Sequence, residues 1–197
     1  ARVSAFMGMN NRPRLRLYVL LTLLAAALVA LSQRAALQVW AYGYGERTGK
    51  LLSAPAPELP AGLKSLDGAP AQLLPLRGRV VLLHFFTRAC GNCKTMLPRY
   101  SRLADQHAAQ GLVVLGVHTP ETEGEADEAA LRAFVRERSI RWRVIPDTNQ
   151  RAWDRYGIQA WPTALLIDRA GVLRELFIGD DHDQDLGAAV QRLLRDR

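Results

Sequence analysis

The sequence reads VVLLHFF at residues 80–86 and, four residues further on, Cys90-Gly91-Asn92-Cys93. These are the only two cysteines in a chain of 197 residues. The apolar run predicts a buried strand, and apolar residues at helical spacing follow the second cysteine. A C-x-x-C motif between a strand and a helix is typical of a redox-active dithiol. Because a helix N-terminus favours a thiolate, we expect Cys90 to be the nucleophile and Cys93 to resolve the mixed disulfide.

Strands and helices alternate on both sides of this motif. Apolar runs predict strands at 80–86, 112–117, 144–146, 163–167 and 172–178, and helical spacing predicts helices from the cysteines to Gly111, at 125–138, 149–156 and about 183–194. The order β-α-β-α-β-α-β-β-α implies parallel strands joined by helical crossovers, followed by an antiparallel hairpin. This is the α/β thioredoxin fold, a central mixed sheet flanked by helices. Around Asp67-Gly68, residues 63–74 predict an additional N-terminal hairpin extension.

Residues 1–42 predict an N-terminal signal or membrane-anchor helix. Arg12, Arg14 and Arg16 precede an uncharged run of 15 residues, 17–31. A full span needs about 20 residues, so the length fits a cleaved signal peptide or a short anchor. Trp40, Tyr42 and Tyr44 resemble an interfacial aromatic belt, which favours the anchor. Arginines on the N-terminal side predict that the domain faces outward. Residues 43–62, rich in glycine, proline and small residues, predict a linker, which leaves 63–197 as the thioredoxin-like domain.

The distribution of charge argues against a nucleic-acid partner. Of the formal net charge of +7, residues 1–50 carry +6 and the remainder of the chain +1. A nucleic-acid-binding domain would be expected to carry the basic excess itself. Here the excess belongs to the predicted anchor.

Several motifs together resemble the DipZ-like branch of the TlpA/ResA thioredoxin-like proteins. They are LLHFFT at 82–87 before the cysteines, LPRY at 97–100 after them, VHTPE at 117–121, and WP at 161–162 before LLID at 165–168. The resemblance implies a thiol–disulfide oxidoreductase at the bacterial inner membrane, with its domain facing the periplasm or the cell exterior. It also implies protein thiol or disulfide substrates, a membrane protein as electron donor or acceptor, and no cofactor or metal besides the cysteine pair.

Two residues depart from this family's pattern. Met96 stands where the TlpA/ResA group commonly has glutamate, so a role in cytochrome maturation is not implied. Ala89 stands where thioredoxins usually have tryptophan, which makes the surface around the cysteines less apolar.

The resemblance also assigns residues that bind substrate. It implies that Pro162 is cis and faces the dithiol, and that Trp161 offers its main chain to an extended substrate strand. The alternative is an ordinary trans proline at the start of a strand. Gly91 and Asn92, between the cysteines, are expected to influence thiolate stabilisation and to lie at the substrate surface.

Two further candidates concern proton transfer. His84 lies six residues before Cys90, where thioredoxins keep a buried carboxylate, and an imidazole there is able to carry the proton of Cys93. A hydrogen-bonded core histidine is an equal alternative. Glu121 ends the HTPE motif at the C-terminal end of a strand, where open α/β folds line their ligand crevice. It is therefore a candidate to change the pKa values of the site or to contact substrate. We favour the alternative that it is one of several loop carboxylates that cap and charge the next helix.

Other interpretations of the cysteines and of the fold stay open. A purely structural disulfide would close too short a loop to stabilise the protein much, and a metal site lacks a second pair of ligands. A thiol peroxidase of the redoxin fold is a second possible enzyme, although Pro-x-x-x-Thr/Ser-x-x-Cys is absent before Cys90. A thioredoxin-fold binding module with a vestigial dithiol is the non-enzymatic alternative.

Overall fold

The computed structural model describes Leu21, residues 46–181 and residues 183–196. The predicted anchor helix over residues 1–42 therefore lies, apart from Leu21, outside the described residues. Within the described ranges, no helix is both long enough and apolar enough to cross a membrane.

A five-stranded mixed sheet forms the centre of the domain, in the order β3-β2-β1-β4-β5. Its strands are β1 (Val80–Phe86), β2 (Leu112–His118), β3 (Arg143–Pro146), β4 (Thr163–Ile167) and β5 (Leu173–Ile178). The first three are parallel, and β4 and β5 are antiparallel to their neighbours. Every residue of the central strand β1 is buried. This burial on both faces explains its uninterrupted apolar run and confirms the predicted sheet.

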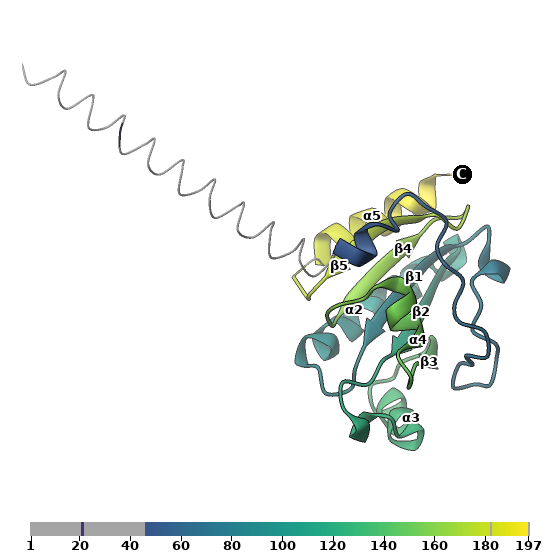
Figure 1. The fold of residues 1–197 in the computed structure, drawn as a ribbon. Coiled ribbons are helices and arrows are strands. Elements are labelled where there is room, and N and C mark those ends of the chain that lie inside the picture. The colour runs from purple at the N-terminus through teal and green to yellow at the C-terminus, as the bar shows by residue number, and fades with distance from the viewer. Residues whose placement is uncertain (1–20, 22–45, 182, 197) are drawn as a thin grey trace, which may run out of the picture. The chain divides into compact units, whose positions relative to one another are not determined.

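Helices cover both faces of the sheet (Figure 1). They are α2 (Gly91–His107), α3 (Glu128–Glu137), α4 (Arg151–Tyr156) and α5 (Asp183–Arg195). On one face, Leu82 of β1 shares a core cluster with Tyr100 of α2 and Val190 of α5. On the other face, Leu83 shares a cluster with Tyr156 of α4. The predicted thioredoxin architecture is therefore present, with helix ends that differ by a few residues from those expected.

The hairpin extension expected at residues 63–74 is present in a short form, with an antiparallel bridge between Lys64 and Pro70. The turn itself is present, and the Asp67 carboxylate accepts a hydrogen bond from the N–H of Ala69 at 3.1 Å. The N–H of Leu66, however, donates to the carbonyl of Val144 in β3 at 2.8 Å. The N–H of Ser65 donates to the carbonyl of Ala69 at 2.9 Å, and the N–H of Ala71 donates to that of Leu63 at 3.0 Å. The two arms therefore pair over a few residues, and the extension is a shorter hairpin than expected.

The segment for which a linker is predicted is fixed against the domain over its described residues, 46–62. The N–H of Ser53 donates to the carbonyl of Leu173 at 2.8 Å, and the N–H of Leu173 donates to the carbonyl of Ala54 at 3.0 Å. Thr48 is buried, and its hydroxyl donates to the carbonyl of Gly157 at 2.9 Å. These bonds place the segment beside β5 and make it part of the packed structure.

Candidate dithiol site

Cys90 is the N-cap of α2, and its sulfur accepts a hydrogen bond from the main-chain N–H of Cys93 at 3.1 Å. The two cysteines form a disulfide, with Cα atoms 5.3 Å apart. Cys93 is only 2% exposed, whereas Cys90 is half-buried and Gly91 and Asn92 are exposed. An incoming thiol or disulfide therefore has access to Cys90 and not to Cys93.

Trp161 and Pro162 join the cysteines at the same end of the sheet. The peptide bond between them is cis. Trp161 packs against the apolar cluster that contains both cysteines, and its ring lies over that of Trp153 with centroids 4.3 Å apart. The main chain of Trp161 makes no hydrogen bond within the described part of the chain. It is thus free to pair with an added strand.

His84 is completely buried in β1, among the rings of Phe86, Tyr100 and Trp142. Neither ring nitrogen has a hydrogen-bond partner among the described residues. Burial lowers the pKa of His84 to about 3, so the imidazole is neutral at physiological pH. The structure therefore lacks the hydrogen bonds expected of an ordinary core histidine, and a neutral ring keeps one free donor and one free acceptor.

The loop carboxylates after β2 divide into different roles. The side chain of Glu121 is exposed. Asp127 caps α3 by accepting from the first N–H groups of that helix, so the predicted helix start at 125 moves to 128. Glu125 instead turns inward and is only 6% exposed. Its carboxylate accepts from the main-chain N–H of Ala89 at 2.7 Å and from the hydroxyl of Thr87.

Glu125 and the neighbouring His118 are both buried but have different charge states. Burial raises the pKa of Glu125, but hydrogen bonds from Thr87, Ala89 and the N–H of Glu121 outweigh this and hold the pKa below its ordinary value. Burial lowers the pKa of His118 to about 4, despite the attraction of the Glu125 carboxylate. At neutral pH the carboxylate is therefore charged and the imidazole is neutral.

Sequence reasoning missed Glu125 and Thr87 as parts of the site. Thr87 carries a weak signal, because it lies three residues before Cys90. Glu125 carries none, because it is one acid among five within eight residues. Only the folded chain shows which of them turns inward.

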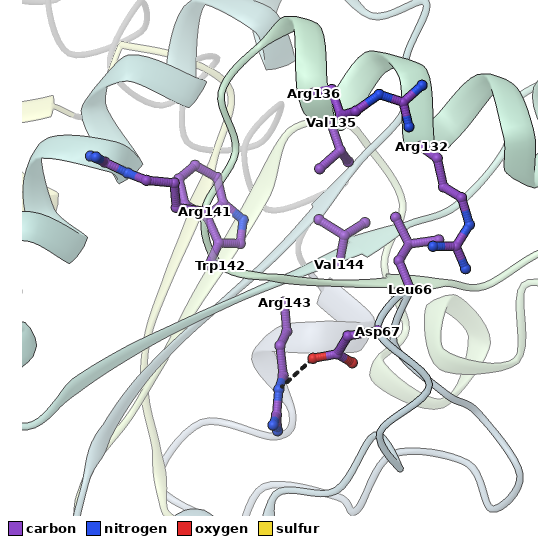
Figure 2. Close-up of a pocket in the computed structure, with 9 residues that line it drawn as sticks. All are labelled: Leu66, Asp67, Arg132, Val135, Arg136, Arg141, Trp142, Arg143 and Val144. Carbon is purple, nitrogen blue, oxygen red and sulfur yellow. Dashed lines mark ion pairs between the residues drawn. The ribbon is translucent and has the colours of Figure 1, made fainter.

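A pocket of about 350 Å³ lies between α3 and β3 (Figure 2). It shares Leu66, Val135 and Val144 with the apolar cluster that contains the cysteines. Arg132 and Arg136 of α3 line it together with Arg141 and Arg143. Figure 2 shows that these guanidinium groups do not converge: Arg143 turns to Asp67, at 3.3 Å, and Arg141 points away from the arginines of α3. Neither cysteine lines this pocket. The candidate chemistry therefore lies at the exposed surface around Cys90, outside the pocket.

Comparison with protein families gives a match to the AhpC/TSA family over residues 52–176. Arabidopsis thaliana Protein SUPPRESSOR OF QUENCHING 1, chloroplastic, is 33% identical over 70% of this chain and 13% of its own length. Mycobacterium tuberculosis Protein DipZ is 32% identical over 68% of this chain and 19% of its own length. The chain thus spans less than a fifth of these two relatives.

A relative of similar size carries an activity in its name. Bacillus anthracis Thiol-disulfide oxidoreductase ResA is 26% identical over 65% of this chain and 71% of its own length. Among solved structures, a crystal structure of a thioredoxin-like superfamily protein superimposes with a TM-score of 0.66 at 29% identity. The match covers 73% of this chain and 97% of that chain.

Proposed function

This chain belongs to the AhpC/TSA family, and from that premise we propose that it is a thiol–disulfide oxidoreductase acting on proteins through Cys90 and Cys93. The observation that carries the proposal is the accessible Cys90 at the start of α2, bonded to the buried Cys93. The name of the relative ResA supports the same activity.

The reaction transfers two electrons and two protons. In the reduced protein, the thiolate of Cys90 attacks one sulfur of a substrate disulfide, which forms a mixed disulfide and releases the other substrate sulfur as a thiolate. The thiolate of Cys93 then attacks the sulfur of Cys90, releases the second substrate thiolate and leaves the Cys90–Cys93 disulfide. A protein dithiol must then reduce that disulfide by the same two steps in reverse. If the partner protein instead supplies a disulfide, it oxidises Cys90 and Cys93, and the cycle then oxidises the dithiols of substrates.

Trp161, Pro162, Gly91 and Asn92 form the proposed substrate surface. The unpaired main chain of Trp161 offers strand pairing to an extended segment of substrate. The exposed Gly91 and Asn92 lie between the two cysteines and leave room for that segment's sulfur to approach Cys90. Glu121, exposed on the loop after β2, is proposed to contact substrate.

His84 is the proposed proton carrier for the resolving cysteine. Its free ring nitrogen would accept the proton that Cys93 must lose before it attacks, and this transfer is uphill because burial lowers the pKa of the ring. Two observations support this assignment: both nitrogens of the ring are without partners among the described residues, and Phe86, which it contacts, lies in the cluster that contains Cys93.

We also propose that the domain is held at the outer face of a bacterial inner membrane and draws its electrons from, or passes them to, a membrane protein. The basic residues before the uncharged run at 17–31 support this location. Fractionation of cells expressing the full chain tests it: the protein is expected in the membrane fraction and accessible to a thiol reagent that cannot enter the cytoplasm.

A thiol peroxidase is the second candidate, favoured by the family match and by Thr87 three residues before Cys90. A hydroxyl can assist a reaction at the cysteine sulfur only if its proton is free to be donated there. Here the buried hydroxyl of Thr87 donates to Glu125, which supports disulfide exchange over peroxide reduction.

Reduction of insulin disulfides by the full chain, with dithiothreitol as electron source, tests the activity. Cys90→Ser should abolish the activity, and Cys93→Ser should retain the first step and accumulate mixed disulfides. Hydrogen peroxide consumption is measured on the same samples. Unchanged insulin reduction in Cys90→Ser would refute the proposal, and peroxide consumption without insulin reduction would replace it with the peroxidase.

A further inference from the structure

The loop that leads into Cys90 is tied to the short 3-10 helix η3 (Glu123–Glu125). The hydroxyl of Thr87 and the N–H of Ala89 both donate to the carboxylate of Glu125, the latter at 2.7 Å. The guanidinium of Arg88 donates to the carbonyl of Gly124 at 3.1 Å. Three consecutive residues before the nucleophile are therefore held by one turn, and Glu125 accepts two of the three bonds.

The Glu125 carboxylate is also the buried charge next to the dithiol. It lies within one hydrogen bond of the residue that precedes Cys90. The groups that face it are the hydroxyl of Thr87, the N–H groups of Ala89 and Glu121, and the neutral His118 of β2. The charged Arg88, partly exposed, acts on His118. Buried and weakly screened, a negative charge acts over several ångströms.

We propose that Glu125 is a positioning residue of the dithiol site, which fixes the loop that presents Cys90 and opposes formation of the Cys90 thiolate. The N-terminus of α2 favours the thiolate, and the carboxylate acts against it. Because only the reduced protein holds a thiolate, destabilising it favours the disulfide. Glu125 thus makes the Cys90–Cys93 dithiol a stronger reductant. That these electrons go to substrate disulfides rests on the proposed function.

Glu125→Gln, compared with Glu123→Gln, tests the inference. Both changes remove one negative charge from η3, but Glu123 is exposed, and its carboxylate makes no hydrogen bond or ion pair with the described loop before Cys90. At a pH below the Cys90 pKa, Glu125→Gln should raise the iodoacetamide alkylation rate of reduced Cys90 by about tenfold, the effect of one nearby charge. Glu123→Gln should change that rate by less than about twofold, because an exposed charge is screened.

The equilibrium with glutathione gives the second readout. In Glu125→Gln the equilibrium constant for exchange between glutathione and the Cys90–Cys93 pair should move toward the dithiol by about two- to tenfold. This corresponds to roughly 10–30 mV for a two-electron couple. Thr87→Val keeps the charge and removes one bond to it, so the alkylation rate should move by less than half as much on a logarithmic scale. Equal effects in Thr87→Val and Glu125→Gln would show that loop geometry alone acts, and no effect in Glu125→Gln would overturn the inference.

Should Glu125→Gln not fold, the wild-type chain still decides. In reduced protein labelled with 13C-glutamate, the Glu125 carboxyl resonance should shift with a midpoint at the Cys90 pKa, because the coupling is reciprocal. The Glu123 resonance should not, and an unresponsive Glu125 would overturn the inference. These measurements need no substrate protein. If insulin is not reduced while Glu125→Gln still shifts the alkylation rate, the proposed function fails and the role of Glu125 stands.

Discussion

The rings of His84 and Tyr100 lie 4.5 Å apart, centroid to centroid, and both side chains are completely enclosed by the core. An imidazole in such a place must shed its proton when the protein folds. The contact between β1 and α2 is therefore linked to pH, although neither residue reaches the surface.

Replacing His84 with leucine should flatten the pH dependence of stability. Burial lowers the folded-state pKa to about 3 from an ordinary value of 6.5. On acidification the unfolded chain binds the proton first, so stability present above the unfolded pKa is lost as the pH falls toward the folded one. Between pH 7 and pH 4.5 this loss amounts to about 2–3 kcal/mol for His84. Urea unfolding of wild type and His84→Leu at both pH values measures it.

The same variant separates the two roles open to His84. If the imidazole carries the proton of Cys93, resolution of a preformed mixed disulfide should slow by about tenfold or more, while the first attack by Cys90 is unchanged. If the mixed disulfide is resolved at the normal rate while stability depends less on pH, His84 is a core residue only. An unaltered pH slope would contradict the burial argument itself.

Alanine at Gly116 should destabilise the domain. A Cβ there would lie 2.9 Å from Nε2 of His84 and 3.1 Å from a ring carbon of Phe86, both in the packed core. We expect a loss of about 1–3 kcal/mol, the usual cost of overpacking. Gly187→Ala in α5 is the matched control, because a Cβ there meets nothing within 4 Å. It should stabilise the helix by about 0.5–1 kcal/mol, and thermal unfolding of both variants should show shifts of opposite sign.

Glu58→Ala should show that the segment before residue 63 supports the domain. The Glu58 carboxylate accepts from the N–H groups of Leu73 and Leu74, the latter at 2.8 Å. Loss of these charge-assisted bonds should cost about 1.5–3 kcal/mol in denaturant unfolding. Glu46→Ala removes only an ion pair with Lys50 that is exposed on both sides, so it should cost less than about 0.5 kcal/mol. Equal losses would mean that Glu58 acts only through its charge.

Trp153→Ala should lower the activity toward protein substrates more than it lowers the reactivity of Cys90 itself. Its ring supports Trp161, with centroids 4.3 Å apart. Removing an aromatic contact of about 1 kcal/mol should lower kcat/KM for insulin by roughly fivefold. Reaction of reduced Cys90 with a small aromatic disulfide should be unchanged, and Trp153→Phe should recover most of the lost activity. An equal fall with both substrates would place the effect on the cysteines.

The sequence predicts the fold well where local pattern and tertiary environment agree. The run at 80–86 is buried on both faces of the sheet, so apolar residues at every position mark a central strand. The hairpin at 63–74 is shorter than expected: its arms pair only around Lys64 and Pro70, and the N–H of Leu66 bonds to Val144, far along the chain. Glu125 escaped prediction similarly: its partners Thr87 and Ala89 lie 38 and 36 residues away.

The bonds between Ser53, Ala54 and Leu173 have a consequence for the behaviour of the protein in a crowded compartment. An open sheet edge invites strands from other chains and leads to aggregation. Residues 53–56 bond to Leu173 at the start of β5 and to the turn before it, and Leu66 bonds to Val144 of β3 at the opposite edge. Under the proposed function, an extended substrate would find part of both edges already bonded, whereas the main chain of Trp161 is unpaired among the described residues. The same short segments would then both limit self-association and favour Trp161 as the docking point.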